Sequence, residues 1–397
     1  MARFFQPSSD NHPPKIYKVK FIPIRQAAFM AAVISFASLA ACNANNSTDS
    51  KTVNTDSTSA MTAGGDSALK PAGPAPAWGP SIKPEMAVVI EKLVALNGKP
   101  IAEISAQEAR QQPTPADAVK AVMADHNMMP PAPQCDTMGK DIPVTGGTTH
   151  IRVYTPKAGT APYPVIVYYH GGGWVIADIN VYGASAQSLC EKTGAVVVAV
   201  EYPKGPEHKF PAAHNVSFDA YQWVLKNTTD LKADSSKIAV VGESAGGNLA
   251  ANVSMMARDK KIKMPIYEVL VYPIAANDTT LESYTKFAEA KPLNRAMMVW
   301  FFKNAAGSVA AGSDKRISLV NANLAGLPPT LIIGAEIDPL QTEGKMLSDK
   351  LTAAGVQTTY QLYTGVTHEF FGMAPLVPEA SQAQDLAVSK LKAAFGK

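Results

Sequence analysis

The sequence predicts an α/β protein with a mostly parallel sheet and helices on both faces. From about residue 136 onward, short runs rich in β-branched and aromatic residues alternate with helical stretches, a pattern typical of parallel strands joined by crossover helices. The central runs, such as Val165–Tyr169, are continuously apolar, as expected of strands buried on both faces. Of the 397 residues, 46% are hydrophobic and 17% are charged, which excludes a chain disordered throughout and a polytopic membrane protein.

The first 41 residues predict a secretory signal peptide. Residues 1–25 are polar and basic, and residues 27–41 are almost entirely small or apolar, a run too short to span a bilayer. The run ends in Leu39-Ala40-Ala41-Cys42, which resembles the lipobox of bacterial lipoproteins; the alternative is an ordinary signal followed by a chance cysteine. The resemblance implies export, lipidation of Cys42 and anchoring to the cell envelope, and Asn43 favours the outer membrane in a Gram-negative cell.

Residues 42–83 are expected to form a disordered tether between this anchor and a folded body that extends from residue 84 to residue 397. Residues 43–70 are rich in Ser, Thr, Asn and Asp, and residues 71–84 contain five prolines, compositions that disfavour a packed core. The net charge of +3 arises from the first 41 residues, which carry five Lys or Arg and one acid. Because the remainder is nearly neutral, the sequence indicates no nucleic-acid partner, and membrane contact is expected through the lipid anchor only.

Each element of the body follows from a local pattern. A helix is expected from Pro84, where apolar residues recur at helical spacing, to about Gly98, and a second from Thr114, as N-cap, to about Asn127. Residues 277–327 contain no convincing strand and are expected to form a helical insertion. Seven runs are expected to be strands: Thr149–Tyr154, Val165–His170, Ala195–Val200, Ile238–Gly242, Tyr267–Tyr272, Thr330–Gly334 and Thr358–Leu362.

A serine lies in a glycine-rich turn between a strand and a helix. The segment Gly242-Glu243-Ser244-Ala245-Gly246 follows the apolar run Ile238–Val241 and precedes a helix expected from about Asn248. Glycines allow so sharp a turn because a Cβ there would collide with the strand or the helix, and the turn exposes the serine at a helix N-terminus. The pentapeptide alone is a weak signal, but its place after an apolar strand indicates a nucleophile.

A second glycine-rich loop, His170-Gly171-Gly172-Gly173-Trp174, follows the strand at Val165–Tyr169. Consecutive glycines let backbone N–H groups approach a substrate oxygen, and with the N–H of Ala245 they would form an oxyanion hole. The alternative is a flexible glycine turn. Neither a Rossmann loop nor a P-loop has this spacing.

An acid and a histidine follow the last two strands. Asp338 comes after the run that ends at Gly334, and His368 comes after Thr358–Leu362, so Ser244, Asp338 and His368 occur in the chain order of a hydrolase triad. Glu336 is the competing acid. Because His368-Glu369 lacks the second histidine of H-E-x-x-H, no metal and no cofactor are expected.

From about residue 84 to its end, the chain resembles the hormone-sensitive lipase branch of the α/β-hydrolases, the bacterial family IV esterases. The resemblance rests on the two glycine-rich motifs, on Pro206–Ala213 and on Pro328-Pro329-Thr330. The chain departs from the family at three places: Glu243 replaces a common Asp, Pro203-Lys204-Gly205 replaces a usual Arg-Leu-Ala, and Glu369 replaces a common Gly.

This resemblance implies an α/β-hydrolase fold with an eight-stranded sheet and a helical cap formed by about 84–130 and 277–327. It implies a serine carboxylesterase acting on short- to medium-chain acyl esters, with Ser244, Asp338 and His368 as catalytic residues and Gly172, Gly173 and Ala245 as the oxyanion hole. The alternatives are an amidase or peptidase with the same triad and an inactive binding protein, and the oligomeric state stays open. Candidate pocket walls are Trp174, Met297, Met298, Trp300, Phe301 and Phe302.

With Cys42 acylated, Cys135 and Cys190 are left in an oxidising compartment. A disulfide between them is possible, but two free thiols are expected, because Cys190 lies in an expected helix as a small buried hydrophobe.

The anchor leads to a direct prediction. Cys42 should be diacylated after removal of residues 1–41, because several acyl chains anchor a protein stably where one does not. Cells fed a fatty-acid probe should label the wild-type chain and leave Cys42→Ser unlabelled. Equal labelling of the two would refute lipidation at this cysteine.

Overall fold

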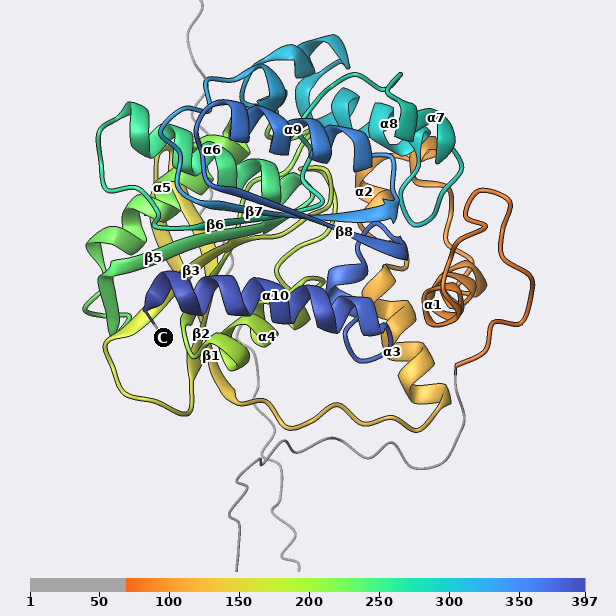
Figure 1. Ribbon diagram of the computed structural model, residues 1–397, viewed down its shortest axis with the longest axis horizontal. Coiled ribbons are helices and arrows are strands. Elements are labelled where there is room, and N and C mark those ends of the chain that lie inside the picture. The colour runs from red at the N-terminus through yellow and green to blue at the C-terminus, as the bar shows by residue number, and fades with distance from the viewer. Residues whose placement is uncertain (1–68, 397) are drawn as a thin grey trace, which may run out of the picture. The chain divides into compact units, whose positions relative to one another are not determined.

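An eight-stranded sheet forms the centre of the computed structural model, which describes residues 69–396 (Figure 1). The expected signal peptide, Cys42 and residues 43–68 of the expected tether lie outside the described residues. The strand order is β1-β2-β4-β3-β5-β6-β7-β8, and β2 is antiparallel to both neighbours while the other pairs are parallel. The predicted α/β-hydrolase sheet is therefore confirmed. The strands are β1 Cys135–Val144, β2 Gly147–Pro156, β3 Tyr163–Tyr169, β4 Val196–Glu201, β5 Ala233–Glu243, β6 Glu268–Val271, β7 Thr330–Ile337 and β8 Thr358–Thr367.

The seven expected strands correspond to β2–β8, but β1 was not predicted. β1 pairs only with β2 at the edge of the sheet, and most of its side chains are exposed. Gly139 and Pro143 further weaken its strand pattern. An edge strand of this kind has no buried face to mark it in the sequence.

Helices cover both faces of the sheet (Figure 1). Along β3, Val165, Val167 and Tyr169 belong to the core shared with α5, α6 and α9, whereas Ile166 and Tyr168 belong to the core shared with α4 and α10. This alternation explains why the strand is apolar throughout. The helices are α1 Pro84–Ala95, α2 Ala106–Ala109, α3 Pro115–Asp125, α4 Gly183–Thr193, α5 Ala212–Lys226, α6 Ala245–Asp259, α7 Glu282–Lys286, α8 Arg295–Ala306, α9 Gln341–Ala353 and α10 Pro378–Phe395.

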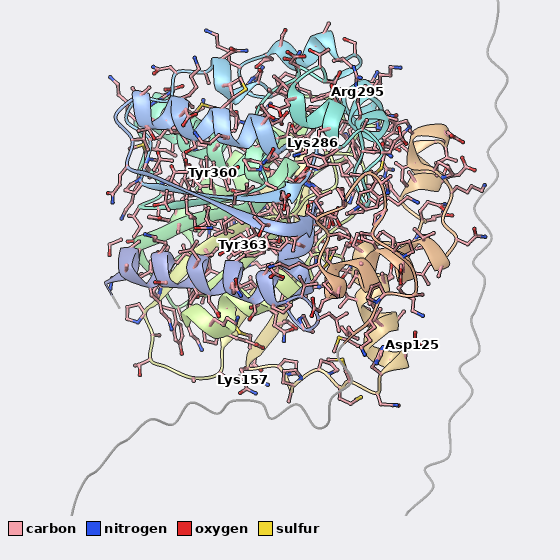
Figure 2. All side chains as sticks on the ribbon, turned by 45° about the vertical axis from the view of Figure 1, so that its right-hand side comes forward. Asp125, Lys157, Lys286, Arg295, Tyr360 and Tyr363 are labelled. Carbon is pink, nitrogen blue, oxygen red and sulfur yellow. A yellow bond between two sulfur atoms is a disulfide. The ribbon has the colours of Figure 1, made fainter. Side chains whose placement is uncertain are left out.

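Two segments far apart in the sequence gather at one end of the sheet. In Figure 2, Lys286 and Arg295 mark the α7–α8 segment, and Asp125 marks the end of the N-terminal helices on the same side.

The expected helix starts at Pro84 and Thr114 are present. Pro84 occupies the first turn of α1, and Thr114 caps α3 by accepting a hydrogen bond from the Asp117 N–H. None of the helices between residues 69 and 396 is long and apolar enough to cross a membrane.

Residues 69–83 pack against the folded body, so the expectation of a tether up to residue 83 is wrong for this part. Trp78 and Ile82 pack against a small cluster formed by Phe287, Ala290 and Ile337. The Lys83 N–H donates to the Gly365 carbonyl of β8 at 2.9 Å. The proline-rich composition of this segment obscured the signal of these two apolar side chains. The folded region therefore includes residues 69–83 and does not begin at residue 84.

Cys135 and Cys190 form a disulfide, so the expectation of two free thiols is wrong. Their Cα atoms are 6.7 Å apart, and both residues are buried. Cys190 lies on α4, as expected, and Cys135 opens β1. Because the sequence did not reveal β1, it could not place Cys135 beside α4.

The disulfide predicts the result of a thiol count. The Cys42→Ser chain, unfolded without reductant, should show no free thiol, and two would contradict the bond. Replacing both remaining cysteines by Ala should lower the free energy of unfolding by about 2–4 kcal/mol, because the bond closes a loop in the unfolded chain. The sequence separation of the two cysteines is 55 residues. Denaturant titration would measure the loss.

Candidate active site

The turn that carries Ser244 has an unusual backbone. Ser244 has φ 56° and ψ −118°, a conformation that a residue with a side chain rarely adopts. Its N–H donates to the Val271 carbonyl of β6 at 2.8 Å. A Cβ at Gly242 would lie 2.0 Å from the Gly246 carbonyl oxygen, and one at Gly246 would lie 2.0 Å from the Tyr169 carbonyl oxygen. The turn therefore requires both glycines, as the sequence indicated.

The structure brings Ser244, His368 and Asp338 together. Nε2 of His368 lies 3.0 Å from Oγ of Ser244, and Nδ1 lies 2.6 Å from Oδ2 of Asp338. The other oxygen of Asp338 accepts a hydrogen bond from the Leu340 N–H at 2.8 Å. The three residues follow β5, β7 and β8, whose carboxyl ends share one edge of the sheet.

Glu336, the competing acid, takes a different place. Its carboxylate accepts hydrogen bonds from Oγ of Ser81 at 2.9 Å and from the Gly365 N–H at 2.7 Å. Glu336 thus links the N-terminal segment to β7 and β8, two strands that lead to Asp338 and His368.

Opposing influences set the pKa of His368. Burial lowers it, but the charge and hydrogen bond of Asp338, with smaller contributions from Glu369 and Glu243, more than offset this and raise the pKa above its ordinary value. The ring of Tyr272 packs against the imidazole with centroids 4.5 Å apart. Asp338 therefore favours a protonated imidazole.

Glu243 lies buried beneath the Ser244 turn. Its carboxylate accepts hydrogen bonds from the hydroxyls of Tyr168 and Tyr272, and burial raises its pKa. Since Tyr272 also packs on His368, Glu243 supports the site through its neighbours.

The loop at Gly172 and Gly173 offers two unused donors. Both residues have positive φ, at 100° and 59°, and a Cβ at Gly173 would lie 2.2 Å from the Phe301 ring. Within residues 69–396, the N–H groups of these glycines donate to no protein acceptor. Ala245 opens α6, where an N–H has no intrahelical partner. These three donors are the expected oxyanion hole.

A cavity of about 640 Å³ leads to Ser244 and His368. Both expected cap segments contribute to its wall, from Leu93 to Pro115 and from Glu289 to Phe301, together with Gly172 and Gly173. Of the candidate pocket walls, Met297, Met298 and Phe301 line the cavity, whereas Trp174, Trp300 and Phe302 do not. Ile176, Ile274 and Leu293 also line it, but nothing in their local sequence distinguishes them from core residues.

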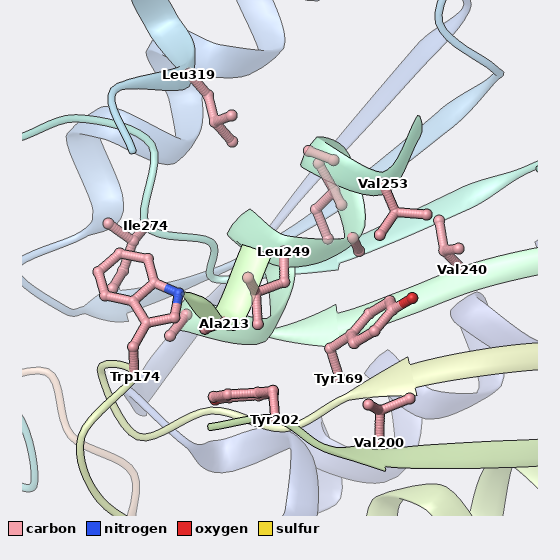
Figure 3. Packing of buried hydrophobic residues seen from close by; sticks show 14 of the residues in the cluster. Tyr169, Trp174, Val200, Tyr202, Ala213, Val240, Leu249, Val253, Ile274 and Leu319 are labelled. Atoms are coloured by element: carbon pink, nitrogen blue, oxygen red, sulfur yellow. The ribbon is translucent and has the colours of Figure 1, made fainter. Parts of the chain in front are cut away.

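Trp174 is a core residue, contrary to its predicted role in substrate binding. It is 3% exposed, and its ring packs near those of His214 and Phe302, at centroid distances of 5.9 and 6.5 Å. Figure 3 shows it beside Ile274 and Ala213. Because φ is positive from Gly172 through Trp174, the chain turns sharply there, and the indole is buried in the core.

Comparisons with known proteins show the family to which the chain belongs. Residues 166–372 match the family model for the alpha/beta hydrolase fold. The chain is 32% identical over 323 residues to the carboxylesterase NlhH of Mycobacterium tuberculosis, covering 80% of this chain and 97% of that protein. It is 29% identical over 327 residues to the ethyl acetate hydrolase of Pseudomonas putida, with coverages of 79% and 99%.

Solved structures give the same result. A hyperthermophilic esterase from the archaeon Pyrobaculum calidifontis has a TM-score of 0.67 and 33% identity, covering 73% of this chain and 94% of that chain. The thermostable carboxylesterase EstE1, cloned from a metagenomic library, has a TM-score of 0.68 and 34% identity, with coverages of 74% and 98%. The chain therefore belongs to the α/β-hydrolase family. Within that family it is a carboxylic ester hydrolase, and the predicted resemblance to esterases is confirmed.

The raised pKa of His368 leads to a pH prediction. A histidine that acts as a base must be unprotonated. Therefore kcat/KM should fall as the pH drops through the pKa of His368, which lies above the usual value of about 6.5 for histidine. Asp338→Asn removes the charge that raises the pKa and leaves the burial that lowers it. The acid limb of its residual activity should shift to lower pH, and an unmoved limb or a shift to higher pH would contradict this assignment.

Proposed function

We propose that this chain is a serine carboxylesterase in which Ser244 is the nucleophile. The observation that carries the proposal is the chain of short contacts on the cavity wall. Oγ of Ser244 lies 3.0 Å from Nε2 of His368, and Asp338 lies 2.6 Å from the other ring nitrogen. This arrangement can activate a hydroxyl and stabilise the imidazolium that forms.

The proposed reaction has two halves. Ser244 attacks the ester carbonyl while His368 takes its proton, and His368 then gives that proton to the leaving alcohol. In the second half His368 activates water, which hydrolyses the acyl-enzyme. Asp338 holds the imidazole in the required tautomer, and the N–H groups of Gly172, Gly173 and Ala245 stabilise the oxyanion.

The proposed substrates are short- to medium-chain acyl esters. Since Trp174 does not line the cavity, it does not limit the acyl chain. Met297, Met298 and Phe301 of α8 close part of the wall instead, and Phe301 lies directly against Gly173. A side chain so near the oxyanion loop supports a short acyl site.

We also propose export and lipid anchoring at Cys42, with the catalytic region outside the cytoplasm. The Cys135–Cys190 disulfide supports this, because structural disulfides persist in oxidising compartments.

Acyl-chain length gives one test. For a series of 4-nitrophenyl esters, kcat/KM should rise with acyl length while the cavity accepts the chain. The reason is that each buried methylene adds up to about 0.8 kcal/mol of transition-state binding. It should then fall before about ten acyl carbons, once the apolar wall is filled. A value that keeps rising beyond that length would contradict the proposed short site.

Triad substitutions test the mechanism. Ser244→Ala and His368→Ala should each lower kcat by about 10⁴-fold or more, because the three side chains act as a unit. Glu336→Gln is the matched control: it alters an acid two residues from Asp338 that has no bond to His368, and its loss should be far smaller. Near-normal turnover by Ser244→Ala would eliminate this residue as the nucleophile.

A further inference from the structure

Glu369 is an acidic residue on the wall of the catalytic cavity that the proposed reaction does not use. It follows His368 directly and lines the same cavity as Ser244. Its φ is 66°, a left-handed conformation that favours glycine. This position therefore carries a carboxylate although its backbone disfavours any side chain.

The protein engages this carboxylate only weakly. Oε1 of Glu369 accepts a hydrogen bond from the Tyr182 hydroxyl at 3.1 Å. Within residues 69–396, no Lys or Arg lies within ion-pair distance of it, and Oε2 has no hydrogen-bond partner. The charged groups that interact with it electrostatically are the titratable His368 and the acids Asp338 and Glu243. One oxygen thus remains available to a ligand in the cavity.

Cations elsewhere on the cavity wall do not neutralise Glu369. Three of the four Lys and Arg side chains that line the cavity are paired with carboxylates that do not line it, and the fourth, Lys291, is exposed. The pairs are Lys99–Glu108, Arg110–Glu207 and Lys204–Glu201. When it is ionised, Glu369 is therefore a negative charge without a cationic partner on the wall of the cavity that holds Ser244 and His368.

Part of the cavity wall is suited to alkyl groups. Met297, Met298 and Phe301 line the cavity, and thioether and aromatic groups pack well against methyl groups next to a positive charge. A cavity lined by a carboxylate and by these side chains suits an alkylated ammonium group better than a hydrated, unsubstituted one.

We propose that Glu369 forms a cation subsite, so that the enzyme prefers esters carrying an ammonium group in their alcohol or acyl part. The proposal rests on the proposed esterase function and deepens it by naming a substrate class. Glu369 is a specificity residue and takes no part in bond making. Burial raises its pKa, and a bound cation would lower it, so assays belong at about pH 8.5, well above the usual range of a glutamate.

Two pairs of esters of equal shape isolate the charge. Choline butyrate and 3,3-dimethylbutyl butyrate differ only in nitrogen against carbon on the alcohol side. The 4-nitrophenyl esters of 4-(trimethylammonio)butyrate and 5,5-dimethylhexanoate differ likewise on the acyl side. In at least one pair, the wild-type kcat/KM should be about tenfold higher for the cationic ester.

For each pair, the ratio of kcat/KM for the cationic ester to kcat/KM for the neutral ester is compared across variants. Glu369→Gln should bring this ratio to about one. Glu289 is an exposed acid on the same cavity wall, and the control variant Glu289→Gln should leave the ratio near the wild-type value. Because both esters of a pair share the same chemistry, any effect on His368 cancels in the ratio. Glu369→Gly is a second variant, since glycine suits the backbone at this position. It should also remove the preference for the cationic ester, and it provides the test if Glu369→Gln does not fold.

A wild-type ratio of one or less in both pairs would overturn the proposal, as would a preference that survives both Glu369 variants. Failure of the proposed function has a different signature. In that case 4-nitrophenyl butyrate, a neutral ester, would be hydrolysed no faster by the wild type than by Ser244→Ala.

Discussion

The backbone conformation of Ser244 is the constraint on which the rest of the site depends. A residue held at such angles costs on the order of 1–3 kcal/mol, and surrounding structure must impose it. Here β6 accepts the Ser244 N–H, and the following loop returns a bond, from the Ile274 N–H to the Ser244 carbonyl at 3.2 Å. Gly242 and Gly246 let strand and helix approach closely. The result is a hydroxyl held above the sheet edge on a rigid support.

The same edge of the sheet supplies the other groups. β7 and β8 are adjacent and parallel, so Asp338 and His368 emerge side by side although 30 residues separate them. Glu336 ties the two strand ends together and binds Ser81 of the N-terminal segment. A segment that was expected to be a loose tether therefore contributes to holding the acid and the histidine in place.

The sequence predicted those parts of the fold and the site that have a signal in their local sequence. Ser244, Asp338 and His368 were predictable because each follows an apolar strand, and parallel strands bring such positions together. Cys135 could not be paired with Cys190, because the pairing needs β1, an exposed edge strand. Trp174 was misplaced because the direction of a side chain after three positive φ angles is a tertiary property. Glu369 was visible only as a departure from a family pattern, and its surroundings needed the structure.

The measurement that tests the central claim most directly is the site of covalent capture. An alkyl phosphonate ester reacts with an activated serine and mimics the tetrahedral intermediate, so the adduct marks the nucleophile. Peptide mass spectrometry of the treated wild-type protein should place a single adduct on Ser244, and Ser244→Ala should stay unmodified at the same concentration. An adduct on another residue, or equal modification of Ser244→Ala, would contradict the account.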